Sequence, residues 1–168
     1  MRYLTVIVVT GVVFTSVLAA PILQKPEKMP DELRALGRIR KVGLRVGLLD
    51  DYLQDIGIGK KDLLDPARAV LEQSGFEPVE EETTPRIDIK SITMRNGRYE
   101  GAVGFVIFID FVQRARVLRL DTDLNLPTAT LPCFGLVDKD DLKERIRTEI
   151  TSTIKYFVEV ERKASKTW

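Results

Sequence analysis

Histidine is absent from the 168-residue chain, and cysteine occurs only once, as Cys133. Without histidine the chain lacks the usual general base near neutral pH, the Ser-His and Cys-His nucleophile pairs, and most kinds of zinc site. A single thiol cannot form an intramolecular disulfide. Cys133 lies within an apolar run, which favours a small buried side chain over a reactive or intermolecular thiol. The sequence therefore predicts no catalytic residue, no cofactor and no metal site.

A large net charge of either sign is also missing. Lys and Arg total 26 and Asp and Glu total 25; residues 1–19 hold one Arg and no acid, so the remainder is balanced at 25 against 25. No basic field exists to attract phosphates, and the sequence predicts no nucleic-acid binding. The hydrophobic content of 44% and charged content of 30% are typical of a globular protein.

Residues 4–18 form the only apolar run that approaches the length of a membrane span. Arg2 precedes this run, and Val17 and Ala19 place small residues where a signal peptidase requires them. The pattern predicts a signal peptide over 1–19 and an exported, periplasmic or extracellular protein that meets the membrane only through this segment before cleavage. An uncleaved anchor is the alternative. Residues 20–37 are predicted as a linker with a short helix, and 38–168 as one domain.

The first part of that domain predicts strand, helix and strand. Apolar residues alternate over 41–49, as in a strand with one buried face. Helical spacing follows over 66–74, with Pro66 at the first helical position after an Asp65 cap and a possible extra turn from Lys60. A short strand is expected at 76–80. Such an order predicts a right-handed crossover that lays the two strands parallel.

A hairpin over 86–113, with Asn96-Gly97 as its turn, is the strongest structural signal. Residues 103–109 are apolar at nearly every position, which predicts a central strand covered on both faces. Helices are expected to cover one face. The other face needs a loop, the 21–37 segment or another protein chain.

Later segments complete the predicted sheet and its covering helix. Alternation over 116–126 predicts a strand with four leucines facing inward, and 128–136 predicts an edge strand because Pro132 cannot donate to a ladder. A long helix over 142–163 has one apolar stripe, and its basic far end is expected to project past the domain. The fold class is therefore α+β: a mixed, mainly antiparallel sheet of five to six strands in the order β-α-β-β-β-β-β-α, with both helices on one face.

Three local patterns invite a chemical interpretation. The segment from Gly57 to Lys60 lacks the full spacing of a phosphate loop. Asp121, Asp123 and Asn125 begin like a calcium loop, but Leu126 and Pro132 stand where the required Gly and Glu would be. Asp50, Asp51 and Asp55 follow a strand end, and carboxylate-pair or Ser-Lys chemistry is the only enzymatic alternative that the composition leaves open. We expect solvated or structural roles for all three patterns.

From residue 41 to residue 163 the chain resembles an uncharacterised family of small exported bacterial envelope proteins. The similar features are the alternating first strand, the helix entry GKKDL and helix end VLEQSGFEPV, the strand PRIDIKSI, the long second hairpin strand, the Thr-rich late strand and the helix LKERIRTEITSTIKYFV. This resemblance implies an α+β envelope domain and supplies no catalytic residues.

Function is expected to be non-enzymatic: an exported cell-envelope interaction or assembly module whose partner is another protein or a second copy. The alternative is a carrier of an apolar or lipid-like ligand held between the sheet and the C-terminal helix. Phe105, Phe108 and Phe111 are the predicted ligand or partner surface, because they lie on the most apolar strand. Aromatic residues there can equally be plain core.

Overall fold

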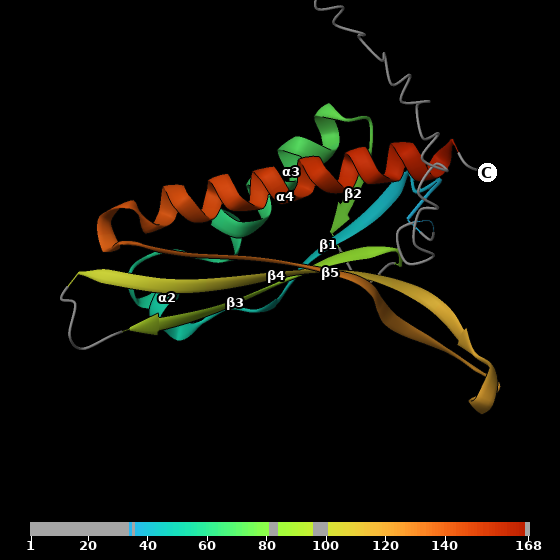
Figure 1. The fold of residues 1–168 in the computed structure, drawn as a ribbon, viewed down its shortest axis with the longest axis horizontal. Helices are drawn as coiled ribbons and strands as arrows, with labels where there is room; N and C mark the ends of the chain where they lie inside the picture. The colour runs from blue at the N-terminus through green and yellow to red at the C-terminus, as the bar shows by residue number, and fades with distance from the viewer. Residues whose placement is uncertain (1–33, 35, 81–83, 96–100, 167–168) are drawn as a thin grey trace, which may run out of the picture.

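The computed structural model describes residues 34, 36–80, 84–95 and 101–166 (Figure 1). The predicted signal peptide and the Asn96-Gly97 turn lie outside these residues. Five strands form one sheet in the order β2-β1-β3-β4-β5. Their bounds are β1 Lys41–Leu48, β2 Glu77–Glu80, β3 Arg86–Arg95, β4 Ala102–Val117 and β5 Thr122–Asp138.

Both kinds of strand pairing occur in the sheet. β1 pairs in parallel with β2 and with β3, whereas β3 with β4 and β4 with β5 are antiparallel. The α+β class and the predicted parallel pairing of β1 with β2 are therefore confirmed. β4 contains the apolar stretch 103–109 and has a neighbour on each side, but the middle position of the sheet belongs to β3.

Among the fully described elements, the helices α2 Asp51–Asp55, α3 Lys60–Gln73 and α4 Leu142–Ser165 accompany the sheet. Figure 1 shows α3 and α4 together on one side of the sheet. Helix α3 includes the extra turn, so the expected start at an Asp65 cap is wrong. The Asp62 carboxylate accepts the Gly59 backbone N–H at 2.8 Å and caps the helix earlier. Pro66 lies inside the helix with its ring buried.

The stripe of α4 is buried as predicted, but its far end does not project. Val160, Glu161 and Ala164 are buried in the last turns. The backbone N–H of Arg38 reaches this end, 3.0 Å from Glu161 Oε1 and 2.7 Å from Ser165 Oγ. Leu36 is also part of the core. The segment before β1 therefore packs against the end of α4, and the packed core includes residues upstream of 38.

One expectation about the late strands is wrong. β4 continues to Val117, a 3-10 turn over Leu118–Leu120 follows, and Asp121 adopts a left-handed conformation with φ 48°. The chain reverses there, so 116–126 is not one strand, and 128–136 is part of the single strand β5. No Gly or Pro marks this turn, which explains why alternation alone concealed it. Pro132 lies on an edge strand, as predicted.

Beyond the sheet, the outer ends of β4 and β5 continue as a two-stranded ribbon, residues 113–127, which we call the arm. Figure 1 shows it bending away from the helices. Thr128 is an extra residue between the pairs Phe111–Ala129 and Val112–Pro127, and this irregularity separates the arm from the sheet.

Candidate functional site

The two faces of the sheet have different surroundings. Because side chains alternate along a strand, odd-numbered residues of β3 and β4 face the helices and even-numbered residues face away from them. The helix side is filled by fully buried apolar side chains: Ile87, Ile89, Val103, Phe105, Ile107, Ile109 and Phe111. We call the other side the open face.

One half of the open face is a charged network centred on two buried acids. Asp88 and Asp110 are directly opposite one another on β3 and β4. Arg45 donates two hydrogen bonds to Asp88, of 3.1 and 2.7 Å, and Arg86 donates a third of 3.0 Å. Two adjacent like charges repel, so each acid needs its own cation to be stable there.

Asp110 is satisfied in the same way. Lys90 Nζ lies 2.6 Å from Asp110 Oδ2, and Thr130 donates its hydroxyl to Oδ1 at 2.7 Å. Acid–base catalysis by two carboxylates requires environments that separate their roles. Here each carboxylate accepts hydrogen bonds from basic side chains in the same way. The two acids therefore form a structural network.

The other half of the open face is apolar and exposed. We call it the open-face patch: Ile92, Met94, Val106, Phe108, Phe134 and Leu136. Strand register places five members in two adjacent rows, Ile92–Val106–Phe134 and Met94–Gly104–Leu136, and puts Phe108 in the next row, between Lys90 and Pro132. Phe134 is 74% exposed, Leu136 75% and Met94 60%. Contiguous exposed apolar side chains of this size mark interaction sites.

The predicted surface of three phenylalanines is divided between the two faces. Phe105 and Phe111 lie in the core on the helix side, and Phe111 stacks on Phe157 with ring centroids 4.3 Å apart. The Phe105 ring packs over Gly135, where a Cβ atom would lie 2.8 Å from it. Only Phe108 is on the open face. Two of the rings proposed to line a ligand cavity are therefore engaged in core packing.

Sequence reasoning missed the most exposed members of the patch. Phe134 and Leu136 share one parity within the segment predicted as an edge strand, and Met94 has the parity opposite to the buried Ile89. The sequence itself shows which of these residues alternate onto the same side of each strand. The missing information was which face the helices cover, and this depends on the crossover and on α4.

The arm is amphipathic. One face carries Ala115 opposite Leu124 and Gln113 opposite Leu126, and the tip residue Leu118 is 84% exposed. The other face carries ion pairs, Arg114 with Asp123 at 3.1 Å and Arg116 with Asp121. The four leucines expected to face inward are thus exposed, because the arm extends beyond the helices.

The residues that suggested calcium or a catalytic acid have structural partners. Asp121 and Asp123 pair with arginines, and no cluster of ligating side chains suited to a metal ion occurs among the residues that the structure describes. Asp50 caps α2 by accepting the Tyr52 N–H at 3.0 Å, and it also accepts from Thr93 Oγ1 at 2.6 Å. Burial raises the pKa of Asp50, but the hydrogen bonds from Thr93 and Tyr52 outweigh burial and lower it overall. Asp51 and Asp55 are exposed.

The segment from Gly57 to Lys60, which suggested a phosphate loop, and Cys133 also have structural roles. Asp62 occupies the N-terminus of α3, where a phosphate would bind, and pairs with Lys143 at 2.8 Å. Hydrogen bonds from Lys143 and Gly59 lower the pKa of Asp62. Cys133 is buried, and burial raises the pKa of its thiol. A thiol of raised pKa is a poor nucleophile.

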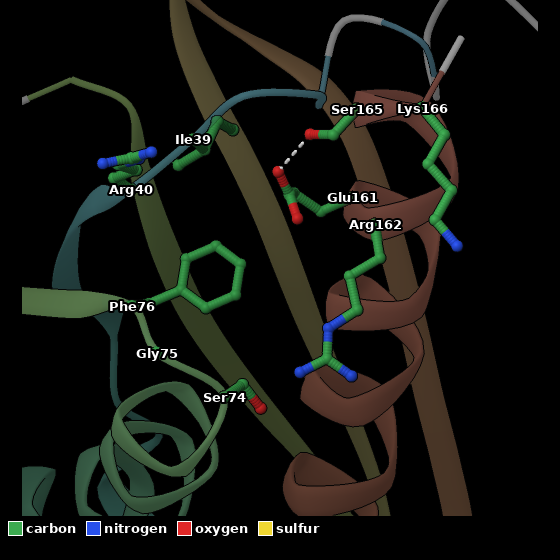
Figure 2. A pocket seen from close by; sticks show the side chains of 9 residues that line it. All are labelled: Ile39, Arg40, Ser74, Gly75, Phe76, Glu161, Arg162, Ser165 and Lys166. Atoms are coloured by element: carbon green, nitrogen blue, oxygen red, sulfur yellow. Dashed lines mark hydrogen bonds between the residues drawn. The ribbon is translucent and has the colours of Figure 1, made fainter.

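A surface hollow of about 410 Å³ lies between the end of α3, the start of β1 and the last turns of α4 (Figure 2). Phe76 and Ile39 contribute apolar surface, and Glu161 accepts a 2.6 Å hydrogen bond from Ser165. Figure 2 shows the Arg40 and Lys166 side chains pointing away from one another. These two cations therefore do not converge on one point.

Comparisons with known proteins add little to this geometry. No family model and no curated protein matches the chain. Among solved structures it is similar to a minor lipoprotein from Acinetobacter baumannii, with 12% identity, 74% of this chain and 92% of that chain covered, and a TM-score of 0.42. A likeness this distant assigns neither family nor function. Within the described part of the chain, no helix has the length and apolar character needed to cross a membrane.

Proposed function

We propose that the protein is an exported, non-enzymatic interaction module of the cell envelope, and that it binds a protein partner through the open-face patch. The observation that carries this proposal is the exposure of Phe134, Leu136 and Met94 on a sheet whose other face packs against the helices. Burying such surface contributes about 25 cal/mol per Å². A partner that covers the patch therefore gains much of its binding free energy there.

The chemistry of the side chains supports a non-enzymatic role. Histidine is absent, Cys133 is buried, and Asp88 and Asp110 are each held by basic side chains. Asp50, which follows the end of β1, serves as a helix cap. These groups are committed to the fold, which leaves recognition as the activity that the described surface favours.

Charge and sequence pattern support the proposed location and the proposed kind of partner. The apolar run before Ala19 supports export. Outside residues 1–19 the positive and negative charges balance, so the protein has no net electrostatic field that would favour nucleic acid or a strongly charged protein as partner. The patch is bordered by the Asp88–Asp110 network. A partner with an apolar centre and polar border matches this surface, as in most protein interfaces.

Site-specific photo-cross-linking in the native host tests the proposal. A photo-reactive amino acid replaces Met94 within the patch, and a control chain carries it at Glu159, an exposed residue of α4. We expect a protein adduct from position 94 and none from position 159. Adding Ile92→Lys, which charges the adjacent row of the patch, should abolish the adduct. Equal adducts from both positions, or an adduct insensitive to Ile92→Lys, would contradict the proposal.

A further inference from the structure

The two edges of the sheet are built differently. β2 has only four residues, contains Pro78, and places Glu77 at the edge in an ion pair with Lys41. Short strands, prolines and charges are the usual means of preventing a sheet edge from pairing with another chain. β5 has seventeen residues; of its prolines, Pro127 lies in the arm and Pro132 lies directly before Cys133. From 133 to 137 the sequence CFGLV carries no proline and no charge.

We propose that residues 133–137 of β5 pair antiparallel with the same residues of a second copy, about a two-fold axis at Gly135. This inference rests on the proposed function and adds a second copy of the chain, bound at the strand edge beside the open-face patch. In that register Phe134 lies opposite the second copy's Leu136, and Cys133 opposite its Val137. Isologous contacts of this kind are the commonest form of protein self-association.

Self-pairing also joins the two open-face patches. The row Ile92–Val106–Phe134 of one copy continues into Leu136–Gly104–Met94 of the other, because each row ends on β5. The dimer therefore presents one apolar strip across six strands. Cross-strand contact between Phe134 and the opposite Leu136 adds packing to the backbone hydrogen bonds.

The surface is hollowed between β5 and α4, next to the residues proposed to pair. A hollow of about 250 Å³ adjoins β5 at Leu131 and Pro132, and α4 lines it with Ser152, Thr153 and Tyr156. Two of these three helix side chains are short. On the helix side, the Phe105 ring packs against Gly135, and this contact holds β5 in place.

A second copy fits this edge better than a lipid surface does. Unpaired backbone N–H and C=O groups at a sheet edge are not satisfied in hydrocarbon, whereas another strand edge satisfies them directly. Balanced charge outside residues 1–19 means that two copies approach without net repulsion. The protein supplies in β5 the exposed apolar edge that such pairing needs.

Sedimentation equilibrium over a range of concentrations, with the purified protein in the form that cells accumulate, tests the inference. Wild type is expected to show twice the monomer mass at high concentration. The double variant Phe134→Lys with Leu136→Lys places like charges opposite in both cross-strand pairs. It should raise the dimer dissociation constant about tenfold or more. Both positions are largely exposed, so the monomer should keep its fold, which circular dichroism checks.

A charge-reversal variant tests the register itself. Phe134→Lys combined with Leu136→Glu sets opposite charges against one another in both pairs, and the dimer should return. Leu118→Lys, at the arm tip, serves as the matched control and should leave the mass unchanged. A monomeric wild type, a dimer that survives the double lysine variant, or no recovery with the opposite charges would overturn the inference. The Met94 cross-link would still form with a different protein if only the self-pairing is wrong.

Discussion

The two faces of β4 show how one apolar strand can serve two purposes. Its odd-numbered side chains, such as Phe105 and Ile107, are fully buried beneath the helices. On the opposite side, Asp110 is covered by the charged network, whereas Val106 and Phe108 are only partly covered. Arginine and lysine stems shield one half of the open face, since such side chains cover apolar surface while their charges stay hydrated. An apolar sequence pattern thus shows that a strand face must be covered, but it does not show which part of the protein covers it.

The largest effect should come from comparing one phenylalanine on each face. Phe111→Ala removes a buried ring that stacks on Phe157 and should lower the free energy of unfolding by about 3–5 kcal/mol. Phe134→Ala on the exposed face of β5 should lower it by less than about 1 kcal/mol. Urea denaturation of the two variants measures the difference. Equal losses would show that the open face is covered in solution.

The sequence alone predicted the strands that pair locally and the buried stripe of α4. Residues 86–95 and 102–117 pair as a hairpin, and Ile146 to Val158 face the core, because alternation and helical spacing record burial directly. The chain reversal at Leu118–Leu120 has no such sequence pattern, because Asp121 rather than a glycine adopts the positive φ. The site was missed for a related reason: periodicity shows that a side is apolar, but tertiary packing determines which side stays exposed.

Removing Asp88 should have the second-largest effect. Asp88→Ala leaves Arg86, whose side chain is mostly buried, without its acid, and it also removes both bonds from Arg45. We expect a loss of about 1–3 kcal/mol in the free energy of unfolding. Asp123→Ala, which breaks an exposed ion pair on the arm, is the control and should cost less than about 1 kcal/mol. Chemical denaturation of both variants decides whether the network stabilises the open face.

Asp50 should have a smaller effect that depends on pH. The pKa of Asp50 in the folded protein lies below its ordinary value of 3.8, so its ionised form stabilises the fold above pH 3.8. That contribution is lost as the pH falls through the lowered pKa. Asp50→Asn keeps a capping side chain without the charge and should cost about 1 kcal/mol or less near neutrality. The difference from wild type should shrink below pH 3.8 in acid denaturation; a constant difference would show that the charge is irrelevant.

The smallest effect on stability should come from the arm tip, which is the region least like the helix-covered sheet. Leu118 is 84% exposed and contributes almost nothing to the core, so Leu118→Gln should change the free energy of unfolding by no more than about 0.5 kcal/mol. A two-stranded ribbon is marginally stable by itself. Hydrogen exchange should therefore show faster exchange for amides of the arm than for those of β4 between 103 and 111. Equal protection would mean that the leucine face of the arm is covered in solution, and that the arm, like the open-face patch, belongs to an interface.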